Sequence, residues 1–285
     1  MDKWNTKEIC GLLAECGGIA LKHYGKCAWK FKSDRSLITA ADSEIENLLK
    51  KEFDRPDEST YLIGEETVET KSEEYIASAM KGTSWVVDPI DGTAPYAHHI
   101  PTWGISIGFM KGGTLEEGAV FLPATAEIFI TEGDHVLYCR TKNTGGRIKF
   151  SRMEKFCSRK LALNDGGLIS VSQDVVKRGR LDVANPVQAV CCTVFSGTYL
   201  ALGRYLAYIG CVKLWDIGGV LPILFKSGFK GRLISGEELT LKVDEKVYHL
   251  SKDHPERWRM RNQMILAPDR KTINYICGQL KDPGR

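Results

Sequence analysis

The sequence of 285 residues has no long apolar run, no cysteine pair at metal-binding spacing and no strong charge of either sign. No hydrophobic stretch approaches the roughly 18 residues that a membrane-spanning helix needs, so no membrane association is expected. Lys and Arg number 39 and Asp and Glu number 36, and the net charge of +3 is too small to attract nucleic acid. The start, Met1–Asn5, is polar and lacks a signal-peptide core, so we expect a cytoplasmic protein.

The nine cysteines follow no disulfide or zinc-binding pattern. Their number is odd, no Cys-x-x-Cys pair occurs, and several lie in apolar runs such as Val190–Cys192. Disulfide frameworks and structural zinc sites both need regularly spaced cysteines. The pattern instead indicates small buried side chains in a reducing compartment.

The composition is typical of a globular protein, with 43% hydrophobic and 26% charged residues. The length predicts about two domains or one large one. No repeat, low-complexity tract or Ser/Gly linker marks a boundary. Asn143–Gly146 is the best candidate for a break between sub-lobes 1–145 and 146–285, although a hairpin turn explains these residues equally well.

Segments with helix-like and strand-like patterns alternate along the chain. Apolar residues at helical spacing predict helices over Thr6–Tyr24, Asp42–Phe53 (after the capping residue Thr39), Ser72–Met80, Ser196–Ile209, Trp215–Phe225 (kinked at Pro222) and the residues after Asp269. Short apolar runs predict strands at Tyr61–Ile63, Trp85–Val87, Gly104–Met110, Gly118–Leu122, Glu127–Thr131, Val136–Arg140, Leu168–Ser172, Gly231–Ser235 and Met264–Ala267. This alternation is typical of the mixed α/β or α+β class.

The segment Trp85–Thr93 is the most informative for chemistry. A hydrophobic strand ends at Asp88, Pro89 stiffens the turn, and Gly92 lets the backbone turn tightly after Asp91. Two carboxylates leaving one strand end repel each other unless a cation lies between them, and Mg²⁺ prefers oxygen ligands. Backbone amides after Gly92 would face a phosphate if a helix begins there. Taken alone, these residues are more simply explained as a surface Asp-Pro-x-Asp-Gly turn.

Three further acidic positions have simple local explanations. Glu65 follows Gly64 at the end of a short strand, where a solvated acidic turn is common. Asp216 follows Trp215 at the start of a predicted helix, and Asp42 also lies at a helix start. Aspartate is a favoured capping residue at such positions.

Together these motifs resemble the inositol monophosphatase family, a group of Mg²⁺-dependent, lithium-sensitive phosphatases. The Gly-Glu-Glu turn at Gly64, the Asp-Pro-Ile-Asp-Gly-Thr element at Asp88 and the Trp-Asp element at Trp215 occur in the family's order and at similar spacing. The likeness extends from about residue 5 to about residue 280. It implies a five-layered α/β/α/β/α sandwich of the sugar-phosphatase type, formed by residues 1–285 as a single unit, and a homodimer.

The resemblance also implies a site for two or three Mg²⁺ ions. Glu65, Asp88 and the carbonyl of Ile90 would hold the first ion. Asp88, Asp91 and Asp216 would hold the second. Glu65 and Thr93 would be the catalytic residues that orient and deprotonate the attacking water. The substrate would contact Asp91, Gly92, Thr93, Cys192 and Asp216.

The substrate side departs from the pattern of inositol-specific relatives. Ile209 stands where they carry a glutamate, and a hydrocarbon cannot accept hydrogen bonds from a polyol. Val190–Thr193 replaces a Gly-Ser/Thr-Ala stretch, and Ser36 replaces an aspartate. Lys213 and Arg178 would meet either a second anionic group or, more simply, solvent.

The predicted activity is therefore Mg²⁺-dependent hydrolysis of a small phosphorylated alcohol similar to inositol monophosphate. Hydrolysis of a bisphosphate (3′-phosphoadenosine 5′-phosphate or fructose 1,6-bisphosphate) or of histidinol phosphate is the alternative. A metal-binding regulatory dimer without turnover is the non-enzymatic alternative, which the altered residues at Ile209, Cys191 and Cys192 suggest.

Overall fold

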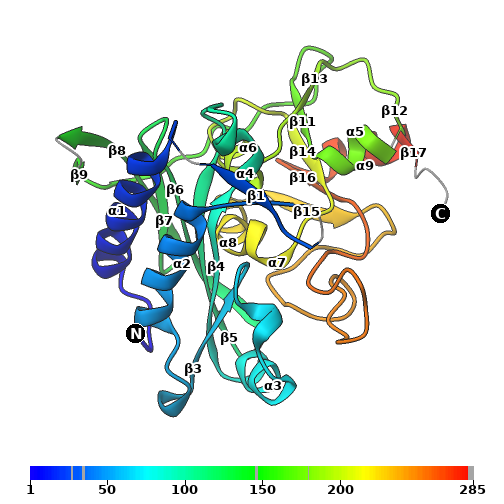
Figure 1. Ribbon diagram of the computed structural model, residues 1–285. Helices are drawn as coiled ribbons and strands as arrows, with labels where there is room; N and C mark the ends of the chain where they lie inside the picture. Colours follow the sequence, from blue (N-terminus) through cyan, green and yellow to red (C-terminus); the bar gives the residue numbers. More distant parts are fainter. Residues whose placement is uncertain (27, 34–35, 145–146, 179, 282–285) are drawn as a thin grey trace.

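The computed structural model describes residues 1–26, 28–33, 36–144, 147–178 and 180–281 of the chain. It contains two large β-sheets, with helices outside each sheet and between them (Figure 1). Within the described residues, no helix combines the length and the apolar character needed to cross a membrane. The eight cysteines in this part of the chain are all free thiols.

The first sheet is built from the earlier part of the chain. Its strands are β3 (Thr60–Gly64), β4 (Thr83–Asp91), β5 (Gly104–Lys111), β6 (Thr114–Leu122), β7 (Glu127–Glu132), β8 (His135–Thr144), β9 (Arg147–Phe150) and β10 (Glu154–Lys155). They follow the order β10-β8-β7-β6-β5-β4-β3, and β9 pairs with β8. Only β3 and β4 are paired in parallel within this sheet as described. The six strands predicted between Tyr61 and Arg140 are confirmed.

The second sheet is built from the later part of the chain. Its strands are β11 (Ile169–Val171), β13 (Val187–Ala189), β14 (Ala207–Gly210), β15 (Lys230–Leu233) and β16 (Met264–Ala267), in the order β13-β11-β14-β16-β15. Two short pairs lie outside both sheets: β1 (Trp29–Phe31) with β2 (Leu37–Thr39), and β12 (Arg180–Leu181) with β17 (Leu280–Lys281).

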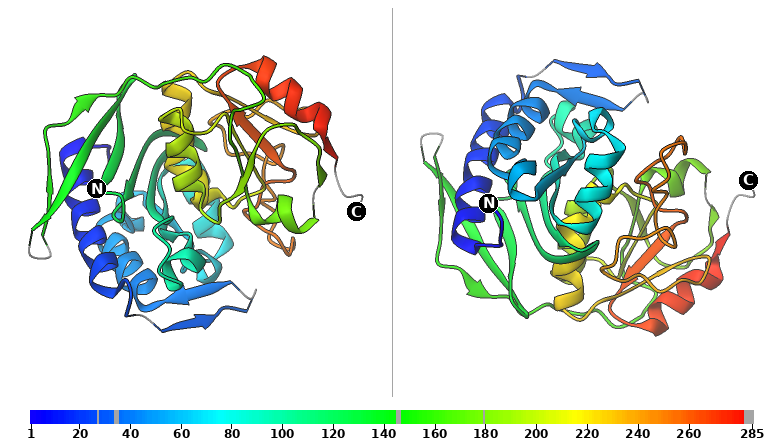
Figure 2. Two further views of the ribbon diagram at one scale, coloured as in Figure 1. Left: turned by 90° about the horizontal axis from the view of Figure 1, so that it is seen from above. Right: turned by 90° about the horizontal axis from the view of Figure 1, so that it is seen from below.

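The helices divide into three layers around the two sheets. The outer layers contain α1 (Thr6–His23) and α2 (Ala40–Phe53) on the first sheet, and α5 (Gln173–Arg178) and α9 (Arg270–Gln279) on the second. The central layer contains α6 (Thr193–Ala201), α7 (Leu214–Gly218) and α8 (Val220–Lys226). Helix α3 (Glu73–Lys81) packs against β3 and β4, and the short α4 (Thr93–Ala97) follows the end of β4. The views in Figure 2 show this alternation, which confirms the five-layered α/β/α/β/α prediction.

Three buried apolar clusters hold these layers together. Between the first sheet and its outer helices, Trp85 of β4 stacks on Phe53 of α2 with ring centroids 4.0 Å apart. Leu221 of α8 belongs to the cluster between the sheets, and Ile209 and Ile273 belong to the cluster behind the second sheet. Each of these side chains is buried, and such burial contributes about 1.5–3 kcal/mol per side chain.

Two helix predictions are wrong in detail. The predicted helix Ser196–Ile209 ends as α6 at Ala201, and its last residues form strand β14. Gly203, with a φ of +68°, turns the chain between them, and such a φ favours glycine. The predicted helix Trp215–Phe225 divides at Gly219 rather than at Pro222. Pro222 lies in the first turn of α8, where the missing N–H breaks no helical hydrogen bond.

The candidate break at Asn143–Gly146 coincides with a hairpin. Asn143 pairs with Ile148 and Thr144 pairs with Arg147 in the antiparallel β8–β9 pair, while Gly145 and Gly146 lie outside the described residues. The first sheet therefore continues past this position. Whether residues 1–285 act as one unit stays a prediction.

Candidate metal centre

Strand β4 supplies both aspartates of the Asp-Pro-Ile-Asp segment. Its pairing with β5 is regular as far as Asp88 and then shifts register before Asp91. Pro89 lies within this irregular stretch and has no N–H to donate to the ladder. Asp88 and Asp91 are 1% and 6% exposed, so β4 carries two carboxyl groups into the interior.

The third aspartate comes from the central helical layer. Asp216 lies in the first turn of α7, and its Oδ2 accepts a hydrogen bond of 2.9 Å from the Lys213 backbone N–H. Its expected capping role is therefore present. One carboxylate oxygen from each of Asp88, Asp91 and Asp216 lies within 4.8 Å of the others. Among the described residues this is the one group of three or more acidic, His or Cys side chains so arranged.

Glycines allow α7 to lie close enough to the first sheet for this arrangement. A Cβ atom on Gly118 of β6 would lie 2.2 Å from the carbonyl oxygen of Gly219, and one on Gly108 of β5 would lie 2.6 Å from that of Gly218. Both contacts are with backbone atoms, which cannot move aside by changing rotamer. The position of Asp216 therefore depends on small residues at two strands that carry no ligand.

Burial and mutual repulsion disfavour ionisation of the three aspartates. Burial raises the pKa of Asp88 and Asp91 well above the ordinary range, and it raises that of Asp216 to about 6. Asp91 is partly stabilised by hydrogen bonds from the Val194 N–H and the Cys192 thiol. Oδ1 of Asp88 is buried without a hydrogen-bond partner. An unpartnered buried oxygen among three carboxyl groups fits a hard cation such as Mg²⁺.

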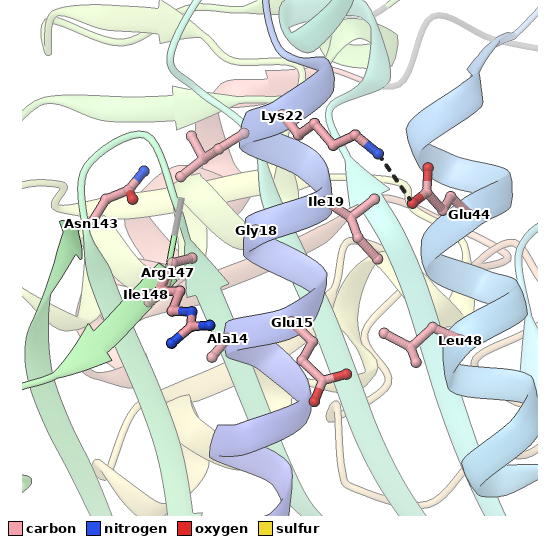
Figure 3. Close-up of a pocket in the computed structure, with 11 residues that line it drawn as sticks. Ala14, Glu15, Gly18, Ile19, Lys22, Glu44, Leu48, Asn143, Arg147 and Ile148 are labelled. Atoms are coloured by element: carbon pink, nitrogen blue, oxygen red, sulfur yellow. Dashed lines mark ion pairs between the residues drawn. The ribbon is translucent and has the colours of Figure 1, made fainter. Parts of the chain in front are cut away.

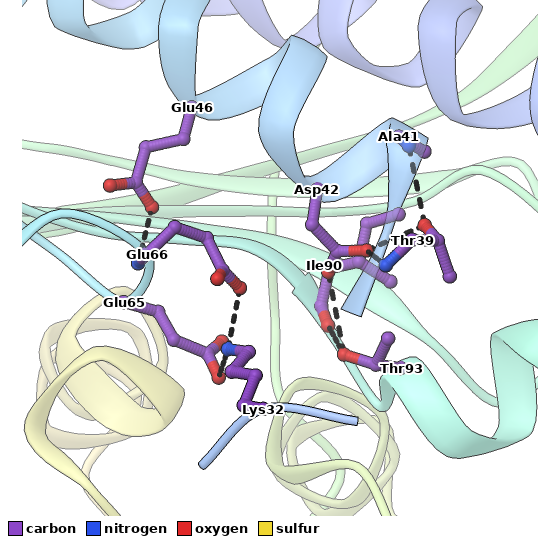
Figure 4. Close-up of polar contacts among 9 residues, drawn as sticks. All are labelled: Lys32, Thr39, Ala41, Asp42, Glu46, Glu65, Glu66, Ile90 and Thr93. Atoms are coloured by element: carbon purple, nitrogen blue, oxygen red, sulfur yellow. Dashed lines mark hydrogen bonds and ion pairs between the residues drawn. The ribbon is translucent and has the colours of Figure 1, made fainter. Parts of the chain in front are cut away.

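Glu65 lies beside this group but outside it. It follows Gly64 at the end of β3, and a Cβ on Gly64 would lie only 2.5 Å from Oε1 of Glu46. The Lys32 ammonium donates to Glu65 Oε1 at 2.8 Å and to Glu66 Oε1 at 2.6 Å (Figure 4). Glu65 lines the same pocket as Asp91 and Asp216, with its carboxylate held by Lys32.

Thr93, the other predicted catalytic residue, begins α4 directly after Gly92. Its Oγ1 lies 3.0 Å from the Ile90 carbonyl oxygen and 3.4 Å from Oδ1 of Asp42 (Figure 4). Asp42 is fully buried and also accepts a bond from the Thr39 hydroxyl at 2.6 Å. The capping role predicted for Asp42 is present, but its contact with Thr93 was not foreseen, because it joins segments 51 residues apart.

These residues open onto a pocket of about 500 Å³. Its lining residues include Ser36, Glu65, Asp91, Gly92, Thr93, Ser172, Gln173, Asp174, Lys177, Cys191, Cys192, Tyr208, Cys211, Asp216 and Arg259. Ile209 is not among them, because alternate side chains of a strand point to opposite faces. The expectation that Ile209 shapes the pocket is therefore wrong, and the neighbouring Tyr208 lines it instead. The Cys192 thiol, predicted to contact substrate, is 3% exposed and bonds to Asp91.

A separate cavity of about 740 Å³ lies over α1, α2 and the β8–β9 hairpin (Figure 3). Its lining is mixed, with apolar side chains such as Ile19 and Leu48 and an ion pair of 3.9 Å between Lys22 and Glu44. No group of metal-binding side chains lines it among the described residues. The smaller pocket beside the aspartates is therefore the candidate site.

The raised pKa values predict how metal and pH affect stability. Asp216 and Asp42, with pKa values of about 6, and Glu66, with a pKa of about 8, bind protons more tightly in the folded chain than in the unfolded chain. Without metal, the free energy of unfolding should therefore fall as pH rises from about 4 to about 8. Mg²⁺ should offset the part of this loss that comes from the aspartates of the metal-binding group, because it compensates their ionised carboxylates.

Calorimetric melting at pH 5 and pH 8, in EDTA and in Mg²⁺, checks this prediction. The increase in Tm caused by Mg²⁺ should be larger at pH 8. An equal increase at both pH values, or none, would contradict the assignment of this cluster as a cation site.

Comparison with known proteins assigns the chain to a family. Residues 6–268 match the model of the inositol monophosphatase family. The chain is 22% identical to the fructose-1,6-bisphosphatase/inositol-1-monophosphatase of Thermotoga maritima over 260 residues, which cover 89% of this chain and 94% of that protein. It is 28% identical to the histidinol-phosphatase of Chlorobaculum parvum over 240 residues, covering 80% and 88%. Human inositol monophosphatase 1 is 25% identical over 203 residues, covering 67% and 69%.

Solved structures share the fold. The Thermotoga maritima IMPase has a TM-score of 0.66 at 18% identity, covering 95% of this chain and 97% of that one. A staphylococcal inositol monophosphatase-1 soaked in LiCl has a TM-score of 0.71 at 16% identity, covering 98% and 97%. An IMPase/NADP phosphatase complexed with Mg²⁺ and phosphate has a TM-score of 0.68 at 16% identity, covering 95% and 93%. The chain belongs to the inositol monophosphatase family, a metal-dependent group of enzymes that hydrolyse phosphate monoesters.

Proposed function

We propose that this chain is an Mg²⁺-dependent phosphomonoesterase for a small phosphorylated alcohol. The observation that carries the proposal is the close group of Asp88, Asp91 and Asp216, of which Asp91 and Asp216 line a pocket of about 500 Å³. Three carboxylates so close together need compensating cations, and those cations would attract a phosphate dianion.

The proposed ligands are the ones that the family resemblance implies. Glu65, Asp88 and the Ile90 carbonyl would hold one Mg²⁺, and Asp88, Asp91 and Asp216 would hold another. The unpartnered Oδ1 of Asp88 supports its place in both sets. When bound, Mg²⁺ would supply positive charge for the phosphate oxygens and lower the pKa of a water molecule.

The protein's own side chains would position the attacking water. We assign its orientation and deprotonation to the Thr93 hydroxyl and the Glu65 carboxylate. Asp42 lies 3.4 Å from the Thr93 hydroxyl and can accept its proton, while Lys32 fixes the Glu65 side chain. Positioning of this kind matters because phosphoryl transfer depends more on alignment and charge than on covalent chemistry.

Gly92 and Thr93 would receive the phosphate through their backbone. Gly92 has a φ of +86°, and a Cβ there would lie 2.9 Å from the Cys192 Cβ and 3.0 Å from the Thr102 carbonyl oxygen. Only glycine fits this turn without strain. N–H groups in the first turn of a helix have no helical partner, so those that begin α4 can donate to an anion.

The names of the relatives refer to different substrates, namely fructose 1,6-bisphosphate, inositol monophosphate and histidinol phosphate. We therefore propose a class of substrate rather than a single compound. We propose an inositol-monophosphate-like alcohol, with a bisphosphate or histidinol phosphate as the alternative. Inhibition by lithium, a homodimer and a cytoplasmic location belong to the same proposal; the lithium part is supported by the LiCl-soaked inhibitory complex of a structural neighbour.

A substrate panel tests the proposed function. Phosphate release would be measured with Mg²⁺ from inositol 1-phosphate, histidinol phosphate, fructose 1,6-bisphosphate and 3′-phosphoadenosine 5′-phosphate. We expect release from at least one of them, and none when EDTA replaces Mg²⁺. Tight Mg²⁺ binding without release from any substrate would instead favour a regulatory dimer that has lost turnover. The presence of Glu65, Asp88, Asp91, Thr93 and Asp216 together favours the enzyme.

A further inference from the structure

The pocket beside the aspartates is lined by cationic side chains as well as by carboxylates. Glu65, Asp91 and Asp216 line the part that would bind metal. Another part of the wall is formed by helix α5 and the residues around it, and it carries Asp174, Lys177 and Arg259. A substrate that fills the pocket with its phosphate at the aspartates would also contact this wall.

Arg259 does not offer a free cation to such a substrate. Its guanidinium pairs with Asp174 of α5 and donates to the Cys211 carbonyl oxygen at 3.0 Å. A second carboxylate, that of Glu256, lies 3.6 Å from its Nε. The two carboxylates more than neutralise the single charge of Arg259, and its pairing with Asp174 holds α5 against the pocket.

Lys177, by contrast, has no carboxylate partner among the described residues. Its ammonium donates to Oε1 of Gln173 at 2.9 Å, and an amide carries no charge. Within the described part of the chain, no carboxylate forms an ion pair with Lys177. Burial raises the pKa of the Cys191 thiol, and the Lys177 charge opposes that rise, which places the ammonium near a residue that lines the pocket.

Ser172 adds a second polar group at the same wall. It immediately precedes α5, lines the pocket and is 9% exposed. Its Oγ is buried with no hydrogen-bond partner. By contrast, the Tyr208 hydroxyl, which also lines the pocket, is already bonded to Thr193 Oγ1 at 3.0 Å. An ammonium without a carboxylate partner and a hydroxyl without a hydrogen-bond partner suit an anion better than a neutral polyol.

We propose that Lys177 and Ser172 bind a second anionic group of the substrate, a carboxylate or a second phosphate, and so determine its specificity. This inference rests on the proposed phosphatase function. The sequence offered Lys213 and Arg178 as candidates to contact a second anionic group. Lys213 lies over the Trp215 ring and lines a neighbouring cavity instead. The side chain of Arg178 lies outside the described residues. A cationic alcohol such as histidinol phosphate would be repelled by Lys177.

Matched substrate pairs test the proposal. Glycerol 3-phosphate differs from 3-phosphoglycerate by one carboxylate, and fructose 6-phosphate differs from fructose 1,6-bisphosphate by one phosphate. In at least one pair, the wild-type chain should have the higher kcat/KM for the member with the additional anionic group. A preference in the first pair would identify that group as a carboxylate, and a preference in the second pair as a phosphate. Lys177→Gln should lower the anionic-to-neutral ratio of kcat/KM about tenfold, through KM, and Ser172→Ala about threefold.

Two control variants make the result specific. Lys177→Arg keeps the positive charge and should retain most of the preference. Lys51→Gln removes an exposed lysine of α2 that is remote from the pocket and should leave the ratio unchanged. An unchanged ratio in Lys177→Gln, or a wild-type preference for the neutral member of both pairs, would overturn this inference alone. Absence of phosphate release from every substrate would overturn the proposed function and this inference with it.

Discussion

The Asp91→Asn variant is expected to release phosphate about a thousandfold more slowly than the wild-type chain. Asparagine removes one of the three negative charges that would hold metal, and a loss of about 4 kcal/mol in transition-state stabilisation corresponds to that factor. The variant should nevertheless be the more stable protein in EDTA. Burial and the charge of Asp216 raise the pKa of Asp91, so its ionised form destabilises the fold at neutral pH.

The opposite signs of these two effects separate a lost ligand from a damaged fold. Steady-state kinetics in Mg²⁺ and thermal melting in EDTA measure them. Asp57→Asn, at an exposed position in the turn Pro56–Glu58, is the matched control and should change neither quantity. Activity of Asp91→Asn within tenfold of wild type would refute the assignment of Asp91 as a ligand.

Gly118→Ala is expected to reduce both stability and activity although Gly118 touches no ligand. The new Cβ would lie 2.2 Å from the Gly219 carbonyl oxygen, so β6 and the start of α8 must separate. Overpacking of this kind typically costs about 1–3 kcal/mol. The same movement displaces Asp216 on α7, and a displacement of about 1 Å at a catalytic site lowers rates about a hundredfold.

Chemical denaturation and kcat measured on the same preparation check this prediction. Gly11→Ala is the control, because nothing lies within 4 Å of a Cβ at Gly11 and the residue is in the middle of α1. That substitution should stabilise the chain slightly, since alanine is the better helix former. If Gly118→Ala melts and turns over like the wild type, the close contact between sheet and helix does not position Asp216.

The first sheet was predictable because its strands are short apolar runs bounded by turn residues. The segment Ser196–Ile209 was not, since it is mainly apolar and suits either a helix or a buried strand. Gly203 was the available signal, because a glycine with a positive φ ends α6 before β14 begins. Pro222 misled for a related reason: its effect depends on where the helix starts, and α8 starts only two residues earlier.

The candidate ligands came from a resemblance rather than from spacing. Asp216 lies 125 residues after Asp91 in the chain, and nothing local predicts that the two carboxylates meet. The contacts of Asp42 with Thr93 and of Lys32 with Glu65 likewise depend on tertiary structure. The error at Ile209 came from matching that position to a glutamate of inositol-specific relatives, whereas the pleat of β14 turns Tyr208 toward the pocket instead.

Titration of Mg²⁺ into metal-free protein, with phosphate release as the readout, tests the central claim most directly. Because the reaction would require Mg²⁺ held by Glu65, Asp88, Asp91 and Asp216, phosphate release should be undetectable in EDTA. It should rise to a plateau as Mg²⁺ is added and these carboxylates become saturated. A rate that is the same with EDTA and with Mg²⁺, or protein that binds Mg²⁺ and releases no phosphate from any substrate tested, would contradict the account.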